Sequence, residues 1–235
     1  DHLGALWIGT LNGGLDRYDR ERNQFSHFTH DPTNSQSISN NEITAIYEDA
    51  QGILWIGNRA GLDRYNREAE SFARYQHNPS DHQNTSPGAV LCIYETQDGT
   101  LWVGTEGSGL GSFDRKTETF THFLPELGNP NSISHENIRE IHEDQYGVLW
   151  IATDAGLDRF ERESGSFTHF QKYPADPHSL SHNSVRAIYE EPSGALWIGT
   201  DGGGLNRFDR EAETFSHYQN IPSDPYSLSH NFIND

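Results

Sequence analysis

Five tryptophans recur at a nearly constant interval along the chain. Each stands in a Leu-Trp-Ile/Val-Gly/Ala context, and successive members are 48, 47, 48 and 47 residues apart: Trp7, Trp55, Trp102, Trp150 and Trp197. A period of about 47 residues is typical of a four-stranded propeller blade, and it also fits a pair of helices of the HEAT type. The local residue pattern must therefore decide between strands and helices.

Each repeat has an extended pattern. It begins with an alternating apolar run such as residues 43–47, passes an acidic turn ending in Gly, and continues into the Trp segment. A Gly-rich turn leads to a Leu-Asp-Arg-Tyr/Phe segment and then to a Phe-Ser/Thr-His-Phe/Tyr segment. Alternation with period two, aromatic enrichment and Gly at each reversal indicate strands joined by hairpins. We therefore predict an all-β fold, a β-propeller of five four-stranded antiparallel blades.

The spacings inside the repeat are uniform. The Leu of the third segment and the Phe of the fourth are always ten residues apart, and the next first-strand Ile or Val always follows that Phe by 18 residues. The difference between 47 and 48 lies in the turn after the Trp segment, where residues 10–14 are one residue longer than 58–61. Surface turns absorb length changes and packed strands do not, so all repeats should share one strand register.

The two ends of the chain fall inside a repeat. Ile233 lies in a first-strand pattern, whereas Trp7 follows only part of an acidic turn. The C-terminal strand could complete the N-terminal blade and close the ring by a one-plus-three strand clasp, which would cover both raw edges. We expect residues 1–235 to form a single β-propeller domain. The alternatives are a segment of a larger propeller and an engineered or trimmed fragment without its own activity.

The charge balance narrows the choice of partners. With 35 acidic and 16 basic residues the formal net charge is −19, which disfavours nucleic acid and anionic membranes. No apolar run reaches the roughly 20 residues that a membrane span needs. The single cysteine, Cys92, excludes an internal disulfide and a cysteine-based zinc site. We expect no cofactor and no bound metal.

The repeat unit resembles the two-component regulator propeller repeat. The resemblance is clearest over Ser179 to Arg210 and Ser37 to Asn66, and it extends over essentially the whole chain. It implies an extracytoplasmic (periplasmic or extracellular) sensor propeller whose parent receptor signals through a histidine kinase or diguanylate cyclase. The best understood members of the family sense oligosaccharides. The chain departs from the family in having five units where seven are typical, and Thr85-Ser86-Pro87-Gly88 replaces Ser-Ile-Ser-Asn.

Candidate ligand-binding residues lie where each connection would descend into a central channel. Two successive positions in each blade stand just before the innermost strand, a third position lies inside that strand, and most of the residues there are polar. The set is Asn40, Asn41, His135, Arg139, His182, Asn183, Arg186, His230 and Asn231. Mixed donors and acceptors that converge on one axis would suit a polar ligand. The alternative is that Asn and Ser satisfy loop backbone groups and that the His side chains are merely solvated.

Other recurrent residues have simpler interpretations. A second histidine series, His27, His122, His169 and His217, with Arg74 at the remaining position, lies on the outermost strand and should be solvated or lightly packed. The tryptophans should pack between blades, and the Asp-Arg pairs of the third strand should tie turns together.

No catalytic motif accompanies the repeats, so we expect a non-catalytic protein. The predicted function is a ligand-sensing input domain of a signal-transduction receptor that recognises an oligosaccharide or similar polar small molecule. A partner protein, bound by a scaffold, is the alternative. Among enzymes, a lyase resembling the streptogramin lyases is the nearest possibility.

Overall fold

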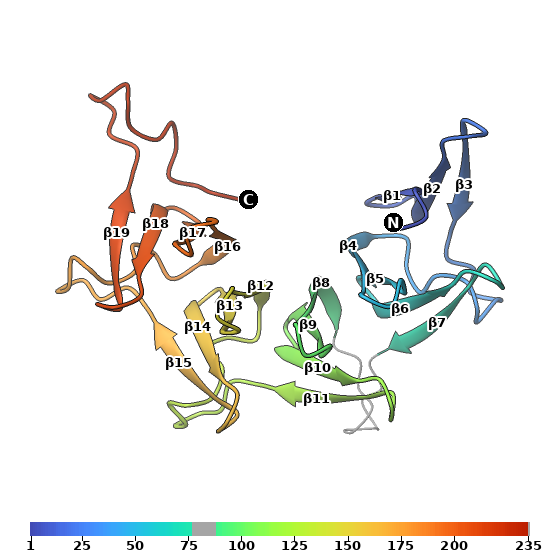
Figure 1. Cartoon of the computed structure of the whole chain (residues 1–235), viewed down its shortest axis with the longest axis horizontal. Helices are drawn as coiled ribbons and strands as arrows, with labels where there is room; N and C mark the ends of the chain where they lie inside the picture. Colours follow the sequence, from blue (N-terminus) through green and yellow to red (C-terminus); the bar gives the residue numbers. More distant parts are fainter. Residues whose placement is uncertain (77–87, 235) are drawn as a thin grey trace. The chain divides into compact units, whose positions relative to one another are not determined.

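The computed structural model describes residues 1–76 and 88–234. These residues form strands and turns without any helix, so none of the described segments is a helix able to span a membrane. The chain divides into two compact units, Asp1–His122 and Phe123–Asp235 (Figure 1). Pro87, which occupies in blade 3 the position that Asn40 has in blade 2, lies outside the described residues.

The first unit contains three antiparallel sheets, which we call blades 1, 2 and 3. Each sheet is ordered as its strands follow one another in the chain. The strands are β1 (Leu6–Gly9), β2 (Leu15–Asp19) and β3 (Gln24–Phe28) in blade 1; β4 (Ile43–Glu48), β5 (Leu54–Asn58), β6 (Gly61–Asn66) and β7 (Ser71–Gln76) in blade 2; and β8 (Ala89–Glu95), β9 (Leu101–Glu106), β10 (Leu110–Asp114) and β11 (Thr119–Phe123), whose last residue belongs to the second unit, in blade 3.

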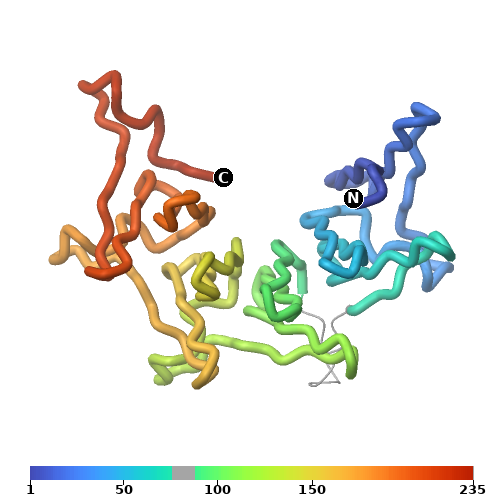
Figure 2. Tube along the Cα trace, viewed as in Figure 1, coloured from blue at the N-terminus to red at the C-terminus, as the bar shows by residue number. Residues whose placement is uncertain are grey.

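The second unit contains blades 4 and 5, each with four strands. They are β12 (Ile138–Glu143), β13 (Leu149–Thr153), β14 (Gly156–Glu161) and β15 (Ser166–Phe170), then β16 (Val185–Glu190), β17 (Leu196–Thr200), β18 (Gly204–Asp209) and β19 (Thr214–Tyr218). In both units the first strands of successive blades are neighbours, and Figure 2 shows the chain running from the outer strand of one blade to the inner strand of the next. The predicted all-β fold of propeller blades is confirmed.

The predicted clasp stays a prediction. Among the described residues the sheet of blade 1 has three strands. The C-terminal segment lies on blade 5, where Phe232 forms an isolated antiparallel bridge with Asp201 and Ile233 N donates to Thr200 O at 3.0 Å. Ile43 N donates to Thr10 O in the same way, at 2.9 Å, where blade 2 follows blade 1. The C-terminal residues therefore take the position of a first strand beyond blade 5.

The core is made at the junctions between successive blades. At the junction of blades 4 and 5, Trp150 and Phe170 pack against Phe208, with ring centroids 5.2 and 5.1 Å apart. Trp55 similarly meets Phe113 between blades 2 and 3 at 5.3 Å. Both tryptophans are 1% exposed, which confirms the prediction that they pack between blades. Such offset and edge-to-face aromatic pairs add to the stabilisation that area burial provides.

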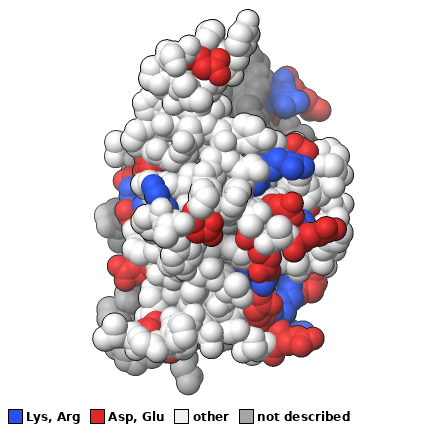
Figure 3. All heavy atoms as spheres, turned by 90° about the vertical axis from the view of Figure 1, so that its left-hand side faces the viewer, with Lys and Arg blue, Asp and Glu red and all other residues white. Residues whose placement is uncertain are grey.

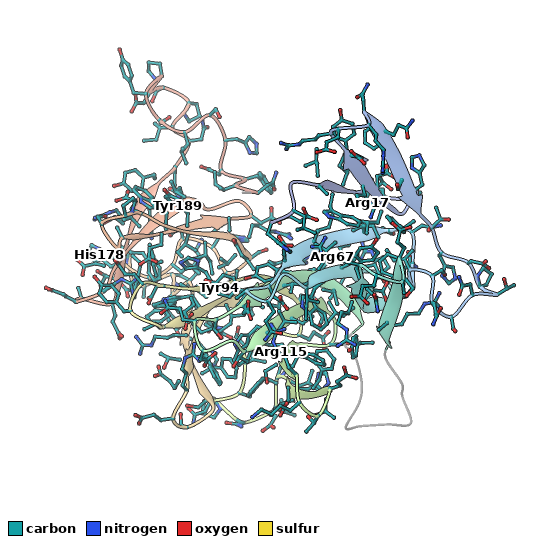
Figure 4. The ribbon with its side chains drawn as sticks, turned by 45° about the vertical axis from the view of Figure 1, so that its right-hand side comes forward. Arg17, Arg67, Tyr94, Arg115, His178 and Tyr189 are labelled. Atoms are coloured by element: carbon teal, nitrogen blue, oxygen red, sulfur yellow. The ribbon has the colours of Figure 1, made fainter. Side chains whose placement is uncertain are left out.

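A repeated arginine also joins successive blades. In blades 1, 2, 4 and 5 a carboxylate of the acidic turn before the Trp strand accepts the indole N–H, as Asp49 Oδ2 does from Trp55 Nε1 at 2.7 Å. That same oxygen accepts Arg115 Nη1 from the following blade at 2.6 Å. Arg67 binds Asp1 and Arg210 binds Asp144 equivalently, and Arg67 and Arg115 are labelled in Figure 4. We call this residue the clamp arginine. Because these carboxylates are buried, the pair adds directional hydrogen bonds to the apolar junction.

In blades 2, 4 and 5 the third strand holds the connection that leads into that blade. Asp158 Oδ2 accepts Ser134 N at 2.7 Å, Asp63 Oδ2 accepts Ser39 N at 2.8 Å, and Asn206 Oδ1 accepts Ser181 N at 2.9 Å. The adjacent Arg159 reaches Glu213 of the next blade. The Asp-Arg pairs therefore tie both a connection and the neighbouring blade, as a framework role requires.

Candidate functional site

The predicted mouth residues before the inner strands close a local turn. Each accepts the backbone N–H two residues later: Asn40 Oδ1 from Glu42 at 2.8 Å, and the Nδ1 atoms of His135, His182 and His230 from Asn137, Ser184 and Phe232 at 2.9, 3.2 and 3.1 Å. A histidine that accepts through Nδ1 must carry its proton on Nε2 when neutral. Each side chain thus accepts a hydrogen bond from the loop backbone, and in the three histidines the Nε2–H group remains a donor.

The asparagines that follow have a structural task. Asn41, Asn183 and Asn231 each accept, through Oδ1, the backbone N–H of the residue eleven positions earlier, at 2.6 Å in every case. This bond joins the end of the outer strand to the start of the next inner strand. The loop-satisfying interpretation of these three residues therefore holds for their carbonyl groups.

A β-bulge sets the direction of the inner-strand side chains. The register of β12 against β13 shifts between Ile138 and Glu140, and that of β16 against β17 shifts between Val185 and Ala187. The residues passed over are Arg139 and Arg186. A bulge leaves one residue out of the ladder and re-aims its side chain. Blades 2 and 3 have the same bulge at Thr44 and Leu91, so the position is structural and only the side chain differs.

Each bulge arginine meets an aspartate in the turn after the second strand. Arg139 makes a two-pronged bond to Asp154, from Nε at 2.9 Å and from Nη2 at 2.6 Å. Arg186 Nη2 donates to Asp201 at 2.5 Å. All four side chains are 18–29% exposed, so the pairs are partly desolvated and still open to water. Removal of one partner of such a pair should therefore cost more free energy than removal of one partner of a surface ion pair.

The Arg139–Asp154 and Arg186–Asp201 pairs are electrostatically coupled. Burial raises the pKa of Asp154, but hydrogen bonds from Arg139 and Asn137 and the charges of Arg139 and Arg186 outweigh burial and lower the pKa to about 2. Ser184, which follows the mouth residues of blade 5, also donates to Asp154 at 3.4 Å. Asp154 therefore stays ionised at every physiological pH and holds both blades' inner strands in one polar cluster.

Blade 5 adds an aromatic surface beside this cluster. Phe232 is 55% exposed and stacks on the His230 ring with centroids 4.9 Å apart. A Cβ on Gly202 would stand 4.0 Å from both the Phe232 ring and His182 Nε2, so Gly202 lies close to both side chains. An exposed aromatic face next to N–H donors is a combination that binds amphipathic polar ligands.

The structure thus separates the nine predicted residues. Asn40 and Asn41 belong to the first unit and the other seven to the second. The corresponding bulge residues of the first unit carry no charge: Thr44 bonds to the Val90 carbonyl, and Leu91 is apolar. We define the polar cluster as His135, Arg139, Asp154, His182, Arg186 and Asp201. Sequence reasoning missed both aspartates, although each follows its arginine by 15 residues in blades 4 and 5 alone.

The outer histidine series is better anchored than the sequence suggested. His169 Nδ1 pairs with Asp158 at 2.7 Å, and its hydrogen bond to Asp158 raises the pKa of His169. His217 Nε2 bonds to the Ser179 carbonyl at 2.7 Å, and Arg74 donates to the carbonyl of Ser37. These side chains hold the connections in place instead of being merely solvated. The described residues contain no group of three or more side chains able to hold a metal.

The segments that match a known protein family coincide with the repeats. Residues 37–60, 85–107, 132–155 and 179–202 match the model of the two component regulator propeller family, once in each of blades 2 to 5. The chain thus contains four two component regulator propeller repeats, in blades 2 to 5. In this propeller each match ends in the turn after the second strand, so the matches in blades 4 and 5 include both members of each Arg–Asp pair.

Two solved structures with a similar fold are of chains much longer than this one. The extracellular domain of a hybrid two component system from B. thetaiotaomicron is 24% identical with a TM-score of 0.77, and the match covers 97% of this propeller and 28% of that chain. PorZ, a surface component of the type-IX secretion system of Porphyromonas gingivalis, is 17% identical with a TM-score of 0.69, covering 97% and 34%. The propeller thus spans about a third or less of these relatives.

A virginiamycin B lyase from Staphylococcus aureus is also similar, with 17% identity, a TM-score of 0.65 and coverage of 95% and 69%. At these identities the likeness shows the β-propeller fold alone. No curated protein matches the chain significantly.

Proposed function

We propose that the polar cluster of the second unit binds an oligosaccharide or a similar polar small molecule, and that the chain serves as the non-catalytic input domain of a receptor outside the cytoplasm. Hydroxyl-rich ligands need donors and acceptors held in fixed positions, together with an apolar face. Arg186, Asp201 and His182 Nε2 supply the polar groups, and Phe232 supplies the face.

The bulge arginines carry this proposal. All four bulges are structural, yet charge is placed on them only in the two blades whose turns supply an aspartate. Framework needs alone do not explain this difference, because Thr44 and Leu91 occupy the same bulge. In the described residues Arg186 gives one hydrogen bond, to Asp201, although a guanidinium has five N–H donors. Its remaining donors are therefore available to a ligand.

The receptor role rests on the family and the surface charge. Four repeats match the two component regulator propeller family, and a similar fold occurs in the extracellular domain of a hybrid two component system. On the face in Figure 3 acidic and basic side chains are interspersed, without a continuous basic patch among the described residues. With a net charge of −19, this surface favours a neutral polar ligand over a polyanion.

A glycan array followed by calorimetry tests the proposal. The wild-type chain should bind at least one oligosaccharide on the array, and calorimetry with that oligosaccharide should show Arg186→Ala binding at least tenfold more weakly. The physical reason is that a hydrogen bond from a charged donor commonly contributes about 1.5–3 kcal/mol. Loss of the arginine would also leave Asp201 without its partner.

Arg207→Ala is the matched control. Arg207 lies in the same blade and is exposed, so its removal changes the net charge identically without touching the polar cluster. We expect Arg207→Ala to bind as the wild type does. Absence of binding by a folded sample, or an equal loss in both variants, would rule the proposal out.

A further inference from the structure

His169 lies between two hydrogen-bond acceptors. Its Nδ1 stands 2.7 Å from the Asp158 carboxylate on β14, and its Nε2 stands 3.0 Å from the carbonyl oxygen of Pro130. An ionised carboxylate and a carbonyl can only accept, and a neutral imidazole has a single N–H. Both hydrogen bonds together therefore require the doubly protonated, cationic ring. The Asp158 side chain is 0% exposed and supplies the compensating negative charge.

The second acceptor belongs to the connection that leads into blade 4, residues 124–137. The His169 ring fastens this connection near Pro130. Asp158 fastens it again near the inner strand, where Oδ2 accepts Ser134 N at 2.7 Å. The residue after Ser134 is part of the polar cluster, so the ring and its aspartate hold the segment that borders the candidate site.

Blades 2 and 5 hold their connections from the same cross-strand pair without a second imidazole proton. In blade 2 the pair is Asp63 and Arg74, and the permanently charged guanidinium donates to carbonyls of its connection. In blade 5 the pair is Asn206 and His217. Among the described residues the His217 ring makes one hydrogen bond, to the Ser179 carbonyl, and one N–H suffices for it. Of these three blades, only blade 4 needs a cationic histidine.

The groups that face the His169 ring favour its cation. The hydrogen bond to Asp158 raises the pKa of His169 most, the charge of Asp158 and the carbonyls of Pro130 and Ser132 raise it further, and burial opposes them. The residues on either side of it in β15 carry no charge. Because the pKa is raised in the folded chain, both bonds are present at low pH, and one is lost as the pH rises through that pKa. The carboxylate is the stronger acceptor and keeps the Nδ1 proton.

We propose that His169 is a protonation-dependent latch, whose imidazolium fastens the connection 124–137 to β15 in acid and whose neutral form releases it near Pro130. In the neutral ring the Nε2 lone pair faces the Pro130 carbonyl oxygen, and two acceptors at this distance repel each other. Asp158 keeps its bond to Ser134 in both states, so the release is local. The latch is a property of the free protein and does not depend on the proposed ligand.

Amide hydrogen exchange followed by NMR measures the latch. The Phe167 N–H donates to Asn131 O at 2.9 Å, one residue from Pro130, and the Phe215 N–H donates to His178 O at 2.8 Å at the same position of blade 5. The protection factor of Phe167 should fall by about tenfold between pH 5.5 and pH 8.5, because a hydrogen bond from a charged donor is lost beside it. That of Phe215 should change by about twofold or less. Both amides lie in the second unit, so unfolding of the whole unit would affect them equally.

His169→Arg is the matched variant, because blade 2 has Arg74 at this position. Its Phe167 amide should be equally protected at both pH values, whereas His169→Gln should show the low value at both. Ring NMR of the wild type, which needs no variant, should show His169 protonated on both nitrogens at pH 5.5 and as the Nδ1–H tautomer at pH 8.5. Three results would overturn the latch: constant protection of Phe167 in the wild type, an equal fall at Phe215, or an undiminished pH dependence in His169→Arg.

Discussion

Replacing Asp63 with asparagine is expected to stabilise the first unit at pH 7.5 and to have little effect near pH 4. Asp63 is fully buried, and its Oδ1 has no hydrogen-bond partner. Burial raises the pKa of Asp63 to about 6, against the hydrogen bonds from Ser39. Because this pKa lies above that of the unfolded chain, stability present below pH 4 is lost as the pH rises through 6. Two pKa units correspond to about 3 kcal/mol.

Asparagine should fit at position 63 because Asn206 occupies the corresponding position in blade 5. Asn206 accepts Ser181 N and donates from Nδ2 to the Ile198 carbonyl at 3.3 Å. In Asp63→Asn the amide nitrogen would replace the oxygen that lacks a partner, and it would face the corresponding carbonyl of Ile56. We expect a gain of about 2 kcal/mol in the free energy of unfolding at pH 7.5.

The same substitution at Asp158 should have the opposite sign. Asp158 Oδ1 is paired with His169, so Asp158→Asn removes a charged partner and should cost about 1–3 kcal/mol. The loss should be larger at pH 5.5 than at pH 8, because the pKa of His169 is raised and its pair weakens as the pH rises through that value. Urea unfolding at pH 4, 5.5, 7.5 and 8 measures both variants. Destabilisation by Asp63→Asn at pH 7.5 would contradict this explanation.

Replacing Gly204 with alanine is expected to cost about 3 kcal/mol or more. Gly204 opens β18 with φ +78°, and an added Cβ would lie 2.3 Å from the Tyr218 carbonyl oxygen. Backbone atoms of β19 cannot withdraw without breaking the ladder. The amide of Gly204 also donates to the Asn231 carbonyl at 2.8 Å, so the segment beside Asp201 should loosen.

Gly165→Ala isolates the contribution of the dihedral angle. Gly165 has φ +68° in the same unit, but its Cβ would meet nothing within 4 Å. The other four-stranded blades place Glu70, Glu118 and Glu213 at this position with φ 47–55°. We expect a loss of about 1 kcal/mol or less, measured by thermal unfolding of both variants. Equal losses at the two glycines would show that the carbonyl contact is not responsible.

Much of the fold follows from the repeat itself. The tryptophan interval and the fixed spacings between Leu and Phe place the strands in one register, and the junctions bury the tryptophans as expected. The sequence could not show the bulge, because a two-versus-one pairing depends on the hydrogen bonds of the neighbouring strand. It therefore identified Arg139 and Arg186 as inner-strand residues without showing what aims their side chains.

The candidate site was harder to predict than the fold. Asn41 and its counterparts resemble ligand-binding residues in sequence, yet their carbonyls bind a backbone N–H eleven residues earlier, a contact that only the folded connection creates. Asp154 and Asp201 lie in variable turns, where acidic residues are usually attributed to solubility. His169 was expected to be lightly packed, because nothing in its own strand announces the partner Asp158 on the adjacent one.

Histidine ring NMR tests the central claim, ligand binding at the polar cluster, most directly. In the free protein His135, His182 and His230 should appear as Nε2–H tautomers, because their Nδ1 atoms accept backbone N–H groups. Adding an oligosaccharide identified on the array should shift the Nε2 resonance of His182 and leave that of His169 unchanged. Shifts confined to the outer histidines, or none at saturating ligand, would contradict the account.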